Sequence, residues 1–149
     1  MKGLLLGSDD AVAAWTWRTY QLFPMHVNRA IGIIDTDGTL VGSVLFQSWN
    51  KYNVDISYYG QDTMTPGIVH CLARIAYMDL SVHRVTAMTS KKNRKLIGFL
   101  TRLGFRIEGV QRRFYGPEDI GKNIAIRLVL FREDLERLAG FKKEDERVA

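Results

Sequence analysis

Residues 83–109 constrain the fold more strongly than any other part of the chain, because three kinds of local pattern follow one another there. Residues 84–89 have the composition of a short strand, and a polar turn follows them. Asn93 then precedes a run of ten residues with apolar side chains at helical spacing. Gly104-Phe105 ends that run and opens another strand. The segment therefore predicts a strand, a helix that begins after an Asn, and a second strand.

The remaining residues predict further strands and helices in a regular order. Asp35-Thr36-Asp37-Gly38 is typical of a hairpin turn, and Pro66 suits the first turn of a helix. We expect strands at residues 3–7, 30–34, 39–49, 51–59, 84–89, 105–114 and 123–131, and helices at 11–23, 68–80, 94–103 and 133–139. The first helical region, 11–23, is compatible with one helix, with a helix broken near its end, or with two shorter helices. This order predicts one α/β domain over residues 1–149, with residues 141–149 fraying. Its centre is a mixed, mostly antiparallel sheet of about six to seven strands, flanked by helices.

Two of the helices have a predicted buried face. In the third helix, Leu96, Ile97, Leu100 and Leu103 are expected to point inward, and Arg94, Lys95 and Arg102 outward. In the second helix, the spacing predicts one buried face that consists of Ile68, Cys71, Leu72, Ile75, Ala76 and Leu80.

Composition excludes several classes of protein. The chain has 149 residues, 46% of them hydrophobic, which is enough for one ordinary core. Apolar runs stay far below the roughly 20 residues of a membrane helix, so no membrane partner is expected. Cys71 is the single cysteine, which excludes an internal disulfide and favours the cytoplasm. The cysteine and three histidines lack zinc-ligand spacing, so no metal is expected.

Positive charge is concentrated in one part of the chain. Lys and Arg number 21 against 16 Asp and Glu, and eight of the basic residues fall between residues 91 and 113. Such a cluster attracts anions, although a solvated surface can also carry it. The phosphates of a nucleotide cofactor or a nucleic acid would both suit it. The cluster consists of Lys91, Lys92, Arg94, Lys95, Arg102, Arg106, Arg112 and Arg113.

The strand, Asn93, amphipathic helix and Gly104-Phe105 resemble the second half of the acyl-coenzyme A binding core of the GNAT N-acetyltransferases. The order of predicted elements matches that family along nearly the whole chain. The resemblance implies the GNAT-like acyltransferase fold, with acetyl-CoA as cosubstrate. Within the family, Gly104-Phe105-Arg106-Ile107-Glu108-Gly109 is similar to an element of ribosomal-protein acetyltransferases.

The resemblance also implies which residues hold the coenzyme. Backbone amides of the loop at residues 60–67 would meet the pyrophosphate. This loop keeps only part of the family pattern Gln/Arg-x-x-Gly-x-Gly/Ala. The negative charge of Asp62 would also repel a phosphate unless the side chain turned away. Backbone groups of residues 57–59 would bond the pantetheine, which Asn93 would also contact. Leu96 would line that arm or belong simply to the core. The implied set is Ser57, Tyr58, Tyr59, Gln61, Thr65, Gly67, Asn93, Leu96 and Phe99.

The acid and base of the reaction are less clearly marked. The family often has a Tyr acid seven residues after the Asn, where this chain has Leu100. Asp55, on the same strand face as Ser57, is a candidate base, or a solvent-facing carboxylate. Tyr115 is a candidate acid, or an ordinary loop aromatic. Glu108 is a candidate substrate-facing residue, or the ion-pair partner of an Arg.

These observations predict an enzyme that moves an acetyl group from acetyl-CoA to a primary amine, on a protein N-terminus or a small molecule. A nucleic-acid- or aminoacyl-tRNA-directed GNAT, using residues 91–113, is an alternative. A non-catalytic GNAT-like binding module is another, and a homodimer is compatible with either. In this fold the acceptor site usually comes from the first helix region and the last two strands, whose aromatic residues here are Trp15, Trp17, Tyr20, Phe23, Phe114 and Tyr115. Some of them, Trp15 and Tyr20 above all, are expected in the core, and those that are exposed would form an acceptor pocket or a protein-binding face.

Overall fold

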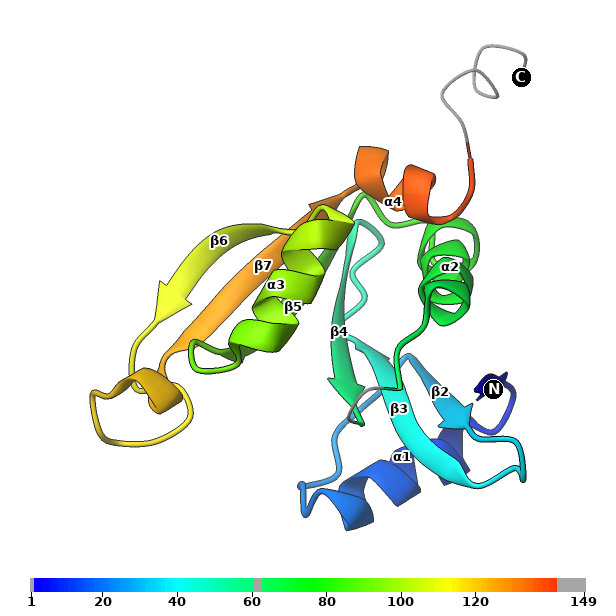
Figure 1. The fold of residues 1–149 in the computed structure, drawn as a ribbon, viewed down its shortest axis with the longest axis horizontal. Helices are drawn as coiled ribbons and strands as arrows, with labels where there is room; N and C mark the ends of the chain where they lie inside the picture. Colours follow the sequence, from blue (N-terminus) through cyan, green and yellow to red (C-terminus); the bar gives the residue numbers. More distant parts are fainter. Residues whose placement is uncertain (1, 61–62, 142–149) are drawn as a thin grey trace.

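The computed structural model describes residues 2–60 and 63–141, which form a seven-stranded sheet with helices on both faces (Figure 1). The strands lie in the order β1-β2-β3-β4-β5-β7-β6. Five neighbouring pairs are antiparallel, and β4 and β5 are parallel. The strands are β1 Gly3–Leu5, β2 Arg29–Ile34, β3 Leu40–Gln47, β4 Asn53–Tyr59, β5 Arg84–Ser90, β6 Arg106–Gln111 and β7 Ala125–Phe131. The predicted mixed, mostly antiparallel sheet is confirmed.

In the part of the chain that the structure describes, four α-helices connect or follow these strands: α1 Asp9–Thr19, α2 Pro66–Arg74, α3 Arg94–Leu103 and α4 Arg132–Leu138. The end of α2 continues as a π-helical turn, Ile75–Asp79, and a short 3-10 turn, Gly121–Asn123, precedes β7. The order predicted from the sequence is therefore confirmed. Within the described residues, no helix is long and apolar enough to span a membrane.

Local chemistry explains why α3 begins and ends where it does. The Asn93 side chain accepts a hydrogen bond from the Leu96 backbone N–H at 3.3 Å, which caps the helix. Gly104 ends the helix at φ 113°, a left-handed conformation that glycine adopts without a steric penalty. The predicted inward residues Leu96, Ile97, Leu100 and Leu103 all pack against the core. The sequence prediction for α3 is thus confirmed residue by residue.

The two faces of the sheet carry cores of different size. The larger core lies under α2, α3 and α4, where Ile31, Phe46 and Val54 of the sheet are at most 1% exposed. The smaller core lies under α1, where Val12 and Leu45 are fully buried. On its face of the sheet α1 contacts β2 and β3 (Figure 1), and among the described helices none packs against β5, β7 or β6 on that side.

Two details of the predicted helices were wrong. The first helix ends at Thr19 instead of residue 23, because Gln21 adopts a left-handed φ of 54° that a helix cannot contain. Cys71 is exposed, although the spacing placed it on the buried face of α2. The buried stripe is centred closer to Leu72 and Ala76, which leaves Cys71 at the exposed edge of the stripe. Residues 142–149 of the predicted tail lie outside the described part of the chain.

Candidate active site

The parallel strands β4 and β5 are paired for only part of their length. Four positions are in register, from Asn53 opposite Arg84 to Ile56 opposite Ala87. Beyond Ile56, residues 57–59 remain paired with β3 but have no register partner on β5. Backbone groups on one edge of Ser57, Tyr58 and Tyr59 are therefore left to other partners, as the pantetheine contacts predicted for these residues require.

A cavity of about 830 Å³ opens where the two strands separate. It extends through the sheet, because side chains of both β4 faces line it, including Asp55, Ser57 and Tyr59 on one face and Tyr58 on the other. The segment after α1 and the residues after β6 close its sides. Among the lining residues are Leu22, Met25, His26, Gln47, Met88, Asn93, Leu96, Leu100, Phe114, Tyr115 and Arg127.

A groove of about 400 Å³ adjoins the cavity on the α3 side. Tyr58, Asn93 and Leu96 line both spaces, so the groove and the cavity lie side by side. The groove also exposes the cationic side chains of Lys95 and Arg102. This combination of an elongated space and positive charge suits a molecule with several phosphates.

The loop that enters α2 borders this groove. Gly60 lines it at φ 127°, and a Cβ there would lie 2.9 Å from Gly42 Cα, so the loop passes too close to β3 for a side chain. Thr65 caps α2 by accepting from the Ile68 N–H at 3.3 Å. Pro66 has no N–H, and within the described residues the amide of Gly67 has no protein acceptor. Gln61, a predicted coenzyme contact, lies outside the described residues.

Asn93 has a structural contact as well as a place in the site. In addition to capping α3, its Nδ2 donates to Thr89 Oγ1 at 3.2 Å, which ties the helix to the end of β5. The same side chain lines both the groove and the cavity. The predicted coenzyme role and a capping role therefore coexist at this position.

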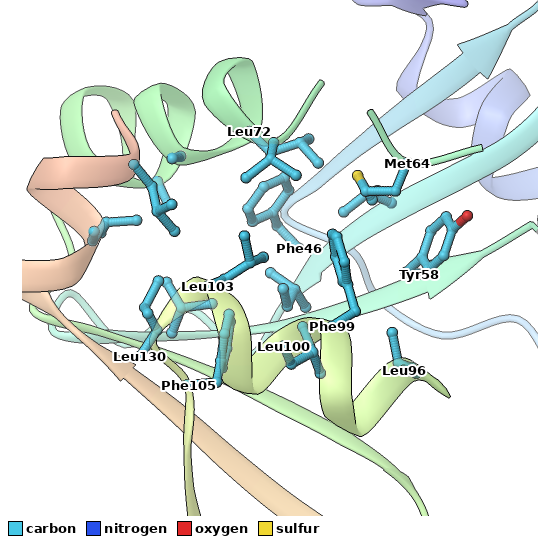
Figure 2. Close-up of a pocket in the computed structure, with 18 residues that line it drawn as sticks. Phe46, Tyr58, Met64, Leu72, Leu96, Phe99, Leu100, Leu103, Phe105 and Leu130 are labelled. Atoms are coloured by element: carbon cyan, nitrogen blue, oxygen red, sulfur yellow. The ribbon is translucent and has the colours of Figure 1, made fainter. Parts of the chain in front are cut away.

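Leu96, Phe99 and Leu100 reach a third, fully apolar space of about 80 Å³ under the helices. Figure 2 shows Phe99 and Leu100 projecting from α3 into this space, with Leu72 and Met64 on its opposite side. Leu96 thus has the core role that the sequence left open, together with a position along the groove. Leu100, at the usual Tyr position, places only hydrocarbon in the large cavity.

Asp55 lies at the end of a chain of hydrogen bonds across the uncovered sheet face. Asn53 Nδ2 donates to Asp55 Oδ1 at 3.0 Å, and Asn53 Oδ1 accepts from the Thr86 hydroxyl at 2.7 Å and from Arg84 Nε at 3.2 Å. Because two donors meet the Asn53 oxygen, its amide nitrogen must face Asp55. Arg84 is anchored in turn by Glu108. Asp55 is thus held toward the cavity, which it lines.

Tyr115 and Tyr59 lie close together in the same cavity. Burial raises the pKa of the Tyr115 phenol above its ordinary value, and the neighbouring Tyr59 phenol adds to the rise. Burial also raises the pKa of Tyr59, partly opposed by a hydrogen bond from Ser57. Both phenols are therefore protonated at neutral pH, which is the form that a proton donor needs.

Glu108 occupies a different place from the other two candidate catalytic residues. It sits at a β-bulge of β6, where the register with β7 shifts between Ile107 and Gly109. Its carboxylate forms an ion pair with Arg84, and it does not line the cavity. The structure therefore unites Asp55 and Tyr115 but leaves Glu108 in the structural pairing that the sequence offered as its alternative.

The acceptor side differs from its predicted composition. Phe114 and Tyr115 line the cavity, whereas Trp15, Trp17 and Phe23 do not, and Phe23 is 90% exposed. Tyr20 packs on Tyr59 with ring centroids 5.1 Å apart. Residues that the sequence reasoning missed are Leu22, Met25, His26, Gln47, Met88 and Arg127. A signal existed for Arg127, since it is a lone charge in the apolar strand Ala125–Phe131.

The basic residues of 91–113 do not all share one role. Lys95 and Arg102 line the groove, while Arg112 pairs with Asp119 in the loop after β6. That Arg112 guanidinium lowers the pKa of Asp119. In the described part of the chain, no three His, Cys, Asp or Glu side chains are grouped as metal ligands.

Comparisons with known proteins agree on the fold. No protein-family model and no curated protein sequence matches the chain. A mutant of spermidine N-acetyltransferase SpeG from Vibrio cholerae has TM-score 0.62 at 13% identity, covering 84% of this chain and 75% of its own. A GNAT-family acetyltransferase from Bacillus anthracis has TM-score 0.57 at 14% identity, covering 70% and 66%.

A protein described as a putative phosphinothricin N-acetyltransferase has TM-score 0.64 at 18% identity, covering 88% of this chain and 98% of its own. Identities this low carry no substrate information, and the predicted likeness to the ribosomal-protein branch stays a prediction. The seven-stranded, mostly antiparallel mixed sheet and its flanking helices nevertheless match the fold of these structures. This chain therefore has the GNAT acyltransferase fold.

Proposed function

We propose that this protein is an N-acetyltransferase that moves an acetyl group from acetyl-CoA to a primary amine. The observation that carries the proposal is the cavity at the separation of β4 and β5, which adjoins a cationic groove on one side and is also lined by residues of the opposite face of the sheet. A two-substrate transfer needs such a passage, because donor and acceptor must reach one point from different directions.

The residues of the groove fit acetyl-CoA. The Gly67 amide at the start of α2, with the helix dipole behind it, would face the pyrophosphate, and Lys95 and Arg102 would face further phosphate. The pantetheine would lie along the free edge of Ser57, Tyr58 and Tyr59 and beside Asn93, Leu96 and Phe99. The coenzyme supplies an acetyl thioester, whose carbonyl carbon accepts the amine.

The protein's own groups would then handle charge and protons. The amine nitrogen forms a bond to the acetyl carbon while the carbon–sulfur bond breaks, and the amine loses one proton. Asp55, held by Asn53, would accept that proton directly or through water. Tyr115, whose phenol is protonated at neutral pH, would give a proton to the departing thiolate. A backbone N–H of residues 57–59 would polarise the acetyl carbonyl.

The acceptor is a primary amine on a protein N-terminus or on a small molecule. The Gly104-Phe105 to Glu108-Gly109 element favours the former by resemblance alone, and in the structure its Glu108 is engaged by Arg84. The cavity favours the latter, because the segment after α1 and the residues after β6 close its sides. A homodimer and cytoplasmic location remain predictions from the sequence.

Calorimetric titration of the purified protein with acetyl-CoA tests the coenzyme site directly. Micromolar binding that weakens as salt rises would support it, because Lys95 and Arg102 are solvent-exposed charges. Thiol release during incubation with a panel of amines and N-terminal peptides would then establish transfer. Absence of binding at low salt would contradict the proposal and favour the nucleic-acid-directed or non-catalytic alternative.

A further inference from the structure

Arg127 differs from the other partly buried arginines in what it donates to. Within the described residues four arginines are partly buried, and three of them reach oxygen acceptors. Arg29 pairs with Asp79, Arg84 with Glu108, and Arg132 donates to the Val82 carbonyl at 2.8 Å. Among the described residues, the only acceptor of the Arg127 guanidinium is the Met88 thioether, with Nη1 3.8 Å from Sδ. A thioether is a weak acceptor, so the hydrogen-bonding capacity of this guanidinium is largely unused by the protein.

The unused N–H donors of Arg127 are available to a molecule in the cavity, because Arg127 lines it. Arg127 lines the cavity but not the groove that contains Lys95 and Arg102. Its neighbours on β7, Ile126 and Leu128, belong to the core under α3, so Arg127 projects from the opposite face of the sheet. The anion that would suit it is therefore not a phosphate of the coenzyme in the groove.

Arg127 shares this face with Asp55. Register pairs connect them through β5, since Asp55 lies opposite Thr86 and Met88 lies opposite Arg127. With strands about 4.8 Å apart and a rise of about 3.3 Å per residue, their backbones are about 12 Å apart. Both side chains line the space between. A small molecule there can place one end near Asp55 and the other against the guanidinium.

We propose that the acceptor is an amino acid, whose amine faces the Asp55 end of the cavity and whose carboxylate is bound by Arg127. This inference rests on the proposed function for the identity of the cavity as the acceptor site. A guanidinium binds a carboxylate through two parallel N–H donors, a geometry that an ammonium group does not reproduce. The apolar side chains of Leu22, Met25 and Met88 line the same space and suit an apolar side chain on the amino acid.

The test uses three ligands that differ only in the group near Arg127: L-leucine, L-leucinamide and 3-methylbutylamine. Binding is measured by calorimetry in the presence of desulfo-coenzyme A, and acetylation by thiol release with acetyl-CoA. We expect the amino acid to bind about 10-fold or more tightly than the amide. Methionine with methioninamide, and glutamate with its α-amide, extend the comparison to other side chains, and spermidine represents the polyamines.

Two variants locate the effect. Arg127→Gln should remove the preference for the amino acid over its amide while leaving the affinity for acetyl-CoA unchanged, and Arg127→Lys should retain part of the preference. Arg106→Gln is the control, because Arg106 is exposed and does not line the cavity. If Arg127→Gln fails to fold, the wild-type ligand pairs still decide the matter.

The binding and acetylation results distinguish failure of the Arg127 site from failure of the proposed function. Equal binding of the acid and the amide by the wild-type protein, or a preference for spermidine, would overturn the inference. Preference for the amino acid without acetylation, combined with absence of acetyl-CoA binding, would support the Arg127 site and contradict the proposed transferase function. Acetyl-CoA binding with amine acetylation that ignores the carboxylate would support the transferase and reject the Arg127 site.

Discussion

The proposed coenzyme side and the proposed acceptor side of the cavity are built from different kinds of structure. On the proposed coenzyme side, the binding groups come from the starts of capped helices: Thr65 caps α2, and Asn93 caps α3. On the acceptor side, the groups come from strand faces and from irregular segments before β2 and after β6. Helix ends present backbone amides that any sequence with the right cap can supply, whereas strand faces present particular side chains. Coenzyme binding should therefore depend on backbone and general charge, and acceptor chemistry on individual residues.

The largest expected effect concerns Asp55 on the acceptor side. Asp55→Asn removes the proposed proton acceptor while keeping the size of the side chain and its contact with Asn53. We expect turnover to fall about 100-fold and the acetyl-CoA dissociation constant to stay within a factor of two or so, by steady-state kinetics and calorimetry. Asp37→Asn, in the exposed hairpin turn, is the matched control. Wild-type turnover in Asp55→Asn would remove this carboxylate from the mechanism.

Tyr115→Phe tests the proposed acid, with an expected loss of about 10- to 100-fold in turnover. The acid must hold its proton to donate it, and the pKa of Tyr115 is raised, so wild-type turnover should not decline at alkaline pH below about 10. A pH profile of turnover measures this. Tyr52→Phe, an exposed tyrosine outside the cavity, is the control. A wild-type rate in Tyr115→Phe would assign the proton to water or to Tyr59.

Gly67→Asp adds bulk and a negative charge on the proposed coenzyme side. A Cβ at Gly67 meets only the Thr65 hydroxyl, at 4.0 Å, so the side chain has room. A carboxylate in the first turn of α2 should preserve or raise the melting temperature, because its negative charge interacts favourably with the positive N-terminal end of the helix dipole. Acetyl-CoA affinity should nevertheless fall about 10-fold. Gly67→Asn controls for bulk, and equal affinities of the two variants would refute the placement of the pyrophosphate.

Asn93→Ala has the smallest expected effect and separates two roles. Loss of the cap should cost about 1 kcal/mol in the free energy of unfolding, measured with urea. The Michaelis constant for acetyl-CoA should rise several-fold. Asn93→Asp retains the cap oxygen, so it should keep the stability but not the coenzyme affinity. If Asn93→Asp restored both quantities, the contribution of Asn93 to the groove would be structural.

The sequence predicts the coenzyme side better than the acceptor side, for the same physical reason. Asn93, the apolar repeat of α3 and Gly104 are local signals whose meaning does not depend on distant residues. The cavity, in contrast, depends on where two strands stop pairing and on which residues of β7 fall opposite β5. Arg127 lines the cavity because β7 pairs with β5 in the register that places it opposite Met88. The position of Glu108 at a bulge, paired with Arg84, is likewise invisible to a count of spacing.

The short register of β4 with β5 has a mechanical consequence. Within the sheet, four paired positions join the block β1–β4 to the block β5–β7–β6. This seam is the line along which the sheet should flex most readily, and amides beside it should exchange with solvent before those of β2 and β3. A coenzyme that contacts both sides of the gap between β4 and β5 would restrict motion of the two blocks of strands relative to each other. Protection from hydrogen exchange along the free edge of residues 57–59 would then report occupancy of the groove even before any acceptor is known.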